Sequence, residues 1–118
     1  MTVALWHERG NIYRVSITGR LLKNDLDTVQ RSVGAEIDRG ATVRLLFELN
    51  RFEGWEPGAN WDLDFYIRHG DRIDRIAIVA DERWRSETLM FAAADLRKGE
   101  VEFFSTGAAS EALAWLSA

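Results

Sequence analysis

Three glutamates, Glu48, Glu53 and Glu56, are the residues of this chain whose type and spacing could support acid–base chemistry. Two carboxylates in different environments can have separated pKa values, so that one acts as an acid and the other as a base. Spacing alone does not show such a pair, so a hydrolase built on these carboxylates is kept only as an alternative. His7 and His69 have no partner at a recognisable spacing, and we expect both to be surface or helix-end residues. No catalytic residue is assigned.

Other common signatures of catalysis and cofactor binding are missing from the sequence. There is no Gly-x-Ser-x-Gly elbow, no Gly-rich phosphate loop ending in Lys-Ser or Lys-Thr, and no Gly-x-Gly-x-x-Gly. Cysteine is absent and only two histidines are present, which argues against thiol catalysis and against a zinc site. We therefore expect a protein that is not an enzyme and that has no cofactor and no metal.

Large aromatic residues are instead concentrated in the middle of the chain. Phe52, Trp55, Trp61 and Trp84 follow two predicted strands. We expect them to gather near the carboxyl ends of these strands, where open α/β sheets usually bind their ligands. A pocket walled by these rings would have few polar anchors and would suit a lipid or another hydrophobic molecule. The alternative is that the rings cover the sheet and close the core.

Two arginines, Arg83 and Arg85, flank Trp84 at the start of a predicted helix and are further candidates for ligand binding. They could contact a charged head group if both side chains turned toward it. The alternative is that Asp81 caps the helix and that both arginines are solvated. The other predicted helix start, after Gly58, is acidic and disfavours an anion.

Composition and charge indicate a single domain over residues 1–118. A chain of 118 residues, 47% of them hydrophobic, can bury a core that needs no disulfide or structural metal. Its formal net charge of −4 gives no overall attraction to a phosphate backbone, so we expect no nucleic-acid partner. No apolar run reaches the ~20 residues of a membrane span, and the amino terminus lacks a basic region followed by an apolar one. We expect a cytoplasmic protein with no transmembrane segment.

Hydrophobic periodicity predicts the elements that must position these residues. Two alternating segments separated by a Gly-Asn dipeptide predict a β-hairpin. Apolar residues at three-and-four spacing between Leu22 and Gly40 predict a helix capped by Asn24 or Asp25. The predicted strands are residues 3–9, 12–18, 43–49, 75–80 and 100–104, and the further predicted helices are residues 59–69, 83–97 and 110–116.

This order of elements predicts an α/β fold. We expect a five-stranded mixed, mainly parallel sheet, in which a hairpin is followed by repeated βα units and four helices lie largely on one face. The strands alternate, so the second face would carry Arg14, Arg44 and Glu48 with a few apolar residues such as Leu46 and Val79. We interpret this wetter face either as solvated or as the contact of a homodimer.

Several short segments resemble a known family. They are Phe52-Glu-Gly-Trp55, Ala59-Asn-Trp-Asp-Leu63, Arg75-Ile-Ala-Ile-Val79 with the later Trp84, Val101-Glu-Phe-Phe104 and Ala112-Leu-Ala-Trp-Leu116. Together they resemble the small SpoIIAA-like proteins of bacteria, a group similar to STAS domains and also compared with the lipid-binding SEC14 domain. The resemblance covers nearly the whole chain. It implies an α/β sheet of this topology, a bacterial cytosolic origin, frequent self-association and no assigned enzymatic activity.

The chain departs from the STAS pattern at the position of a regulatory switch. The resemblance implies that STAS antagonists of anti-sigma factors carry a phosphorylatable Ser or Thr at the start of the helix after the third strand, where a phosphate alters partner binding. Here no serine or threonine occurs between Thr42 and Ser86. The phosphorylation switch therefore cannot be assigned to any residue of this chain.

The leading hypothesis is a non-enzymatic binding module of STAS or SEC14-like fold. It would engage a lipid, another hydrophobic small molecule or a protein partner through residues 52–61 and the helix start at Arg83. Two alternatives remain. One is a homodimeric interaction scaffold of the anti-sigma-factor-antagonist type without the phosphorylatable residue, and the other is the hydrolase that uses loop carboxylates.

Overall fold

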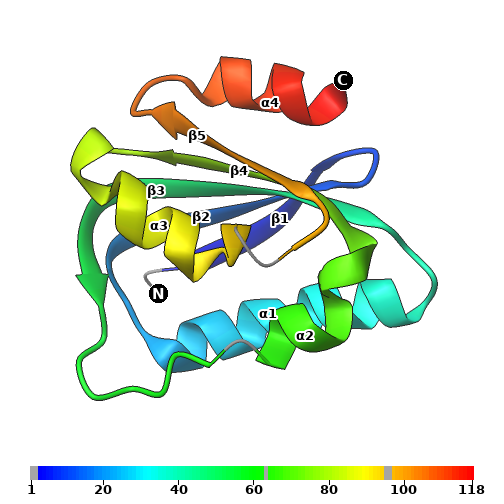
Figure 1. The fold of residues 1–118 in the computed structure, drawn as a ribbon, viewed down its shortest axis with the longest axis horizontal. Coiled ribbons are helices and arrows are strands. Elements are labelled where there is room, and N and C mark those ends of the chain that lie inside the picture. Colours follow the sequence, from blue (N-terminus) through cyan, green and yellow to red (C-terminus); the bar gives the residue numbers. More distant parts are fainter. Residues whose placement is uncertain (1–2, 63, 95–96) are drawn as a thin grey trace.

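The computed structural model describes residues 3–62, 64–94 and 97–118, and its centre is one mixed sheet of five strands (Figure 1). The strands lie side by side in chain order. The first two are antiparallel, and every later neighbour is parallel, so the predicted hairpin and mainly parallel sheet are confirmed. The strands are β1 (Val3–Arg9), β2 (Ile12–Leu21), β3 (Val43–Trp55), β4 (Ile73–Ala80) and β5 (Glu100–Ser105).

Three helices cover one face of the sheet and α4 covers the other (Figure 1). Each step from β2 to β5 moves one place in the same direction between parallel strands. Right-handed crossovers therefore put the connecting helices on a single face. The helix after β5 connects no pair of strands and is free to take the opposite face. The helices are α1 (Lys23–Asp38), α2 (Asp64–His69), α3 (Arg85–Phe91) and α4 (Ala109–Ser117), with short 3₁₀ turns η1 (Gly70–Arg72) and η2 (Glu82–Trp84).

The larger core lies between the sheet and α1 to α3. Strand alternation turns residues such as Val15, Phe47 and Ile78 toward this face, where all three are buried. Helix α1 contributes the predicted apolar stripe, in which Leu26 and Val33 are also buried. Because the stripe repeats at three-and-four spacing, one face of α1 packs against the sheet along its length.

The second face of the sheet is not the wet surface that the sequence predicted. Leu46 is 0% exposed and Val79 is 3% exposed. Both pack in a smaller core with Ala112 and Leu116 of α4. The expectation failed because the sequence does not show where the last helix docks. A homodimer contact through Leu46 is excluded while α4 is in place.

Two arginines of the second face, Arg44 and Arg75, hold the end of α4. Arg44 donates through Nη1 to the backbone carbonyl of Leu116 and lies 2.9 Å from a carboxylate oxygen of Asp74. Arg75 donates to the carbonyl of Trp115 at 2.6 Å, and its guanidinium lies over the indole ring of that residue. Cations near a helix C-terminus complement the unpaired carbonyl groups and the dipole. These arginines are therefore structural rather than solvated.

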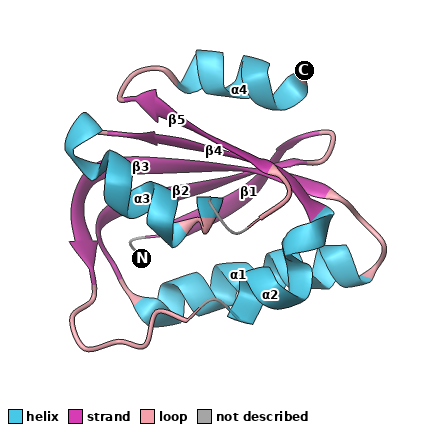
Figure 2. Ribbon diagram, in the orientation of Figure 1, coloured by secondary structure: helices cyan, strands magenta, loops and turns pink. Residues whose placement is uncertain are grey.

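Strand β3 is longer than the sequence predicted, and its extension carries the first two aromatic candidates. The backbone has positive φ at Arg51 (50°) and Gly54 (102°). The pairing of β2 with β3 shifts register between Thr18 and Arg20 and then continues to Trp55. Figure 2 shows β3 bending away from the plane of the sheet over this extension. The sequence analysis placed residues 52–55 in a loop, but in the structure they belong to β3 and are positioned by its pairing with β2.

The helices near this extension are shorter than predicted. Helix α2 begins at Asp64 rather than at residue 59, so Trp61 lies in the segment before it. Helix α3 follows η2 and ends at Phe91, and Ala93 takes a positive φ of 55°. The predicted helix over 83–97 is therefore wrong beyond Phe91, and its residues 95–96 lie outside the described part of the chain. Because α3 ends early, its last residues lie across an open pocket from α1 and α2.

Candidate ligand-binding site

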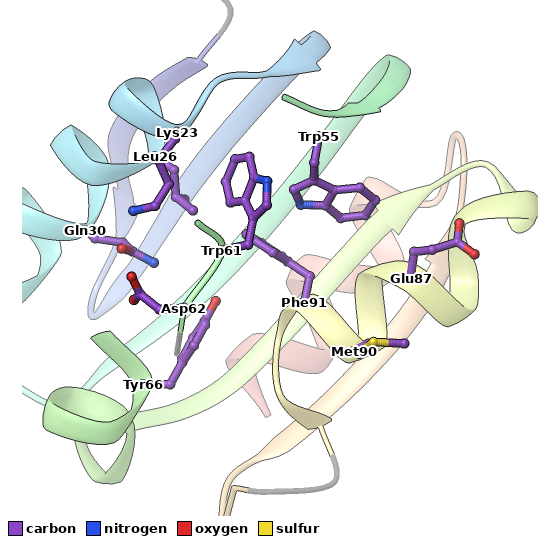
Figure 3. Close-up of a pocket in the computed structure, with 10 residues that line it drawn as sticks. All are labelled: Lys23, Leu26, Gln30, Trp55, Trp61, Asp62, Tyr66, Glu87, Met90 and Phe91. Carbon is purple, nitrogen blue, oxygen red and sulfur yellow. The ribbon is translucent and has the colours of Figure 1, made fainter. Parts of the chain in front are cut away.

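An open pocket with a cavity volume of about 520 Å³ lies on the helical side of the molecule, among α1, α2, α3 and the end of β3 (Figure 3). It is called the large pocket below, and a polar hollow of similar volume, about 530 Å³, adjoins it between α1 and α2. Its walls are mainly aromatic and aliphatic, and its few polar groups come mostly from α1 and the segment before α2. The lining residues are Lys23, Leu26, Gln30, Trp55, Trp61, Asp62, Tyr66, Glu87, Met90 and Phe91.

Trp55 forms one wall of this pocket because the extension of β3 carries it there. Its ring packs against Phe91 of α3, with centroids 5.7 Å apart. It also packs edge-on against Phe52 and Trp84, at 4.9 Å and 6.0 Å. Such offset and edge contacts are the favoured geometries for aromatic pairs. The ring cluster therefore fixes the orientation of Trp55.

Trp61 forms the adjoining part of the wall. It lies between β3 and α2, and its Nε1–H donates to the backbone carbonyl of Glu56 at 3.2 Å. Figure 3 shows Trp55 and Trp61 beside each other on the same side of the pocket. The hydrogen bond ties the indole back to its own segment, so the ring is held in place without a regular element around it.

Glu56 anchors this segment to the first turn of α1. Its Oε1 accepts a hydrogen bond from the backbone N–H of Lys23 at 2.9 Å, and its own N–H donates to the carbonyl of Leu21 at 2.9 Å. The predicted cap at Asn24 or Asp25 is wrong, because the residue before α1 is Leu22, which makes no side-chain cap. A carboxylate from a distant part of the chain satisfies the free N–H group instead.

We expect Glu56→Ala to lower the free energy of unfolding by about 1 kcal/mol, the usual effect of losing a helix-capping side chain. Urea denaturation followed by circular dichroism measures this change. The matched control is Glu53→Ala, since Glu53 is exposed and should change stability by less than about 0.5 kcal/mol. Equal effects of the two substitutions would contradict the capping role.

Most polar groups of the pocket lie toward α1 and α2, and Glu87 lies on α3. Lys23 donates through Nζ to the carboxylate of Asp27, and this hydrogen bond raises the pKa of Lys23 despite partial desolvation. Asp62 and Asp64 add to the same upward shift by charge attraction. Burial raises the pKa of Tyr66 to about 12 although the positive charge of Arg97 opposes it, so the hydroxyl is protonated at neutral pH. Figure 3 shows that hydroxyl directed toward the pocket.

The six residues that the sequence analysis named as candidates for ligand binding lie in different parts of the structure. Trp55 and Trp61 line the large pocket. Phe52 is only 5% exposed and lies behind Trp55 in the ring cluster. The sequence analysis left two alternatives, that the rings line a pocket or that they close the core. Trp55 and Trp61 line a pocket, whereas Phe52 is buried in the core.

A smaller hollow of about 410 Å³ lies at the carboxyl ends of β3 and β4, and Phe52, Arg83 and Trp84 are among its lining residues. Asp81 accepts a hydrogen bond from the Arg83 N–H at 3.0 Å, as the capping alternative predicted. Arg83 lies over the ring of Trp84, with its guanidinium carbon 4.9 Å from the ring centroid. Arg85 pairs instead with Glu82 at 2.8 Å and lines neither hollow.

Several residues of the large pocket were missed by the sequence analysis. Leu26 belongs to the core stripe of α1, and Tyr66 and Phe91 resemble ordinary core residues of short helices. Met90 is unusual for a helix that packs on a sheet, because its side chain is 74% exposed. Its exposure could be known only once the end of α3 was placed.

The three glutamates first considered for catalysis do not form one group. Glu48 shares a strand face with Leu46 and therefore faces the α4 side, whereas Glu56 binds the start of α1 on the opposite side. Among the described residues no group of three or more His, Cys, Asp or Glu is arranged to hold a metal ion. No helix in that part of the chain is both long and apolar enough to cross a membrane.

Comparison with known proteins agrees with this architecture. A crystal structure of an uncharacterised protein of the DUF3478 family from Shewanella loihica PV-4, described as having a SpoIIAA-like fold, superposes with a TM-score of 0.74. The two chains are 23% identical over 97% of this chain and 93% of the other, a likeness that shows the shared fold. No curated protein matches the chain. The SpoIIAA-like family model matches residues 12–117, and the chain therefore belongs to the SpoIIAA-like family.

Proposed function

We propose that this protein is a non-enzymatic binding module that holds a hydrophobic small molecule or the apolar part of a lipid in the large pocket. The main observation in support is a cavity of about 520 Å³ whose walls include Trp55, Trp61 and Phe91. Pockets of about 300–1,000 Å³ with mainly apolar walls and few polar groups are typical of small-molecule sites.

The exposed edge of the pocket supports this proposal. Met90, which lies at that edge, is 74% exposed. Methionine side chains adapt to different apolar shapes and are common on surfaces that bind varied hydrophobic partners. The wall beneath is rigid, because Trp55 is held by the Phe52 and Trp84 rings. A fixed aromatic wall opposite a flexible side chain suits a ligand that enters from solvent.

A test of this proposal is to fill the pocket from α1. Gln30 is half-buried and lines the cavity, so Gln30→Trp should occupy part of the volume. With 1-decanol as the probe, calorimetry should show at least about a tenfold loss of affinity, because the decyl chain would lose much of its contact with the walls. Trp55 and Trp61 should also report binding to the unmodified protein through a change in fluorescence emission.

The matched control is Ile67→Trp, which adds the same indole at a residue that is 77% exposed on α2 and does not line the pocket. Its affinity for 1-decanol should stay within about twofold of the unmodified protein. Thermal unfolding establishes that both variants are folded. A folded Gln30→Trp protein that binds as tightly as the control, or an unmodified protein that binds no decanol, would overturn the proposal.

A further inference from the structure

The charges around the large pocket are predominantly negative. Asp62 and Glu87 lie among its lining residues and place a carboxylate on two different sides of the cavity, as Figure 3 shows. The cation among the lining residues is Lys23, and its ammonium is hydrogen-bonded to the carboxylate of Asp27. Asp64 also acts on Lys23 by charge attraction. Asp62 attracts Lys23 in the same way. This one ammonium therefore faces the carboxylates of Asp27, Asp62 and Asp64, and together with Glu87 the charge around the cavity stays net negative.

The other cations near the pocket lie outside its lining, and those of the adjoining polar hollow share that hollow with Asp27, Asp38 and Asp64. Arg31 and Arg68 line the neighbouring polar hollow between α1 and α2 rather than the aromatic cavity. Arg97, whose charge acts on Tyr66, donates to the backbone carbonyl of Ile73 and is not among the lining residues. An anion entering the cavity would meet Asp62 and Glu87, while Lys23, the cation among the described lining residues, is already hydrogen-bonded to Asp27. Like charges brought together oppose binding.

The aromatic walls favour the same sign of ligand charge. The faces of Trp and Tyr rings carry negative electrostatic potential and attract cations, and quaternary ammonium groups are recognised in this way. Trp55, Trp61 and Tyr66 all line the cavity. The Tyr66 hydroxyl, which points toward the pocket in Figure 3, can also accept a hydrogen bond from an ammonium group.

Resting on the proposed function, we propose that the occupant of the large pocket is a hydrophobic cation, an apolar chain or ring system that carries an alkylammonium group. The apolar part contacts Phe91 and Met90, and the ammonium lies between the aromatic faces and the carboxylates of Asp62 and Glu87. The ammonium can belong to a free amine or to the choline end of a lipid, and these two sources share the same chemistry at the site.

Four probes with the same decyl chain and different heads test this inference by calorimetry: decyltrimethylammonium, decylphosphocholine, 1-decanol and decanoate. We expect decyltrimethylammonium to bind about tenfold tighter than decanoate, with decanol between them. This ratio should fall as salt is raised from 20 to 500 mM, since screening shortens the reach of exposed charges, with a Debye length of about 10 Å at 0.1 M. Tighter binding of decylphosphocholine than of decyltrimethylammonium would assign the lipid source.

The variant that tests the charges is Asp62→Asn combined with Glu87→Gln. Asparagine keeps the oxygen that accepts the Asp64 N–H at 3.1 Å, so the start of α2 should be preserved. The preference for the cation over decanoate should shrink to about twofold in this variant. The control is Glu102→Gln with Glu111→Gln, which removes the same charge from exposed residues on β5 and α4 and should leave the preference unchanged.

The results of these experiments distinguish a failure of the charge inference from a failure of the proposed function. If decanol binds and decanoate binds as tightly as the ammonium probe, the charge inference is overturned and the binding module stands. An unchanged preference in the Asp62→Asn, Glu87→Gln protein also overturns it. If none of the four probes binds, both the inference and the proposed function fall.

Discussion

Leu46→Lys is expected to unfold the protein or to release α4 from the sheet. Leu46 is 0% exposed and packs with Ala77 of β4 and Leu116 of α4. Removing such a side chain by Leu46→Ala should already lower the free energy of unfolding by about 2–5 kcal/mol. Lysine would in addition place an ammonium group in a cluster of buried apolar side chains. Since small domains are stable by only about 5–15 kcal/mol, the combined effect can exceed the total.

Denaturation followed by far-ultraviolet circular dichroism measures this effect. The control is Ile67→Lys, because Ile67 is 77% exposed on α2 and its replacement should change stability by no more than about 0.5 kcal/mol. If Leu46→Lys unfolds at the same urea concentration as Ile67→Lys, α4 does not cover this face in solution. The residue would then be available for the homodimer contact that the sequence suggested.

Gly99→Ala is the second substitution with a large expected effect. A Cβ atom at Gly99 would lie 2.7 Å from the backbone carbonyl oxygen of Asp74 and 2.8 Å from that of Ile73. Neither oxygen can move without shifting the start of β4. The terminal Nη2 of Arg97, 3.0 Å away, itself donates to the Ile73 carbonyl. We expect a loss of about 1–3 kcal/mol in the free energy of unfolding, the usual cost of forcing extra atoms into a packed site.

Gly70→Ala is the matched control for this prediction. The nearest atom to a Cβ at Gly70 is the Cβ of Tyr66 at 4.0 Å, and the backbone does not have positive φ. Alanine there should be neutral or stabilising by up to about 1 kcal/mol, because it restricts the unfolded chain. Thermal unfolding of both variants measures the difference in their stability. A Gly99→Ala protein as stable as Gly70→Ala would show that β5 does not approach β4 this closely.

Gly99 also illustrates how a correct sequence signal can have a different cause. A glycine just after the predicted helix over 83–97 is typical of a helix stop signal, but α3 ends at Phe91. The glycine is required instead because the chain entering β5 passes against the first backbone carbonyls of β4. Glycine permits close backbone approach as well as helix termination, and local sequence does not distinguish the two.

The candidate site could be predicted in part. Aromatic enrichment drew attention to Trp55 and Trp61, which line the large pocket, and their role in ligand binding stays a prediction. It also selected Phe52 and Trp84, which form the ring cluster behind that wall, and Arg85, which pairs with Glu82. Composition identifies rings that must be sheltered from water but does not show which side of each ring meets a cavity. Which rings face the pocket depends on the bend in β3, and that bend depends on the pairing of β3 with β2.

The amino-acid sequence by itself determined the order and type of the main elements and the fold class, but not the bounds of β3, α2 and α3. Period-two and three-and-four hydrophobic spacing are local properties, so the hairpin, the parallel strands and the apolar stripe of α1 were predictable. The tertiary structure alone decided where α4 docks, how Glu56 reaches the first turn of α1 and which residues surround the pocket. Each of these joins segments distant in the chain, and such contacts depend on the packing of whole elements rather than on the spacing of neighbouring residues.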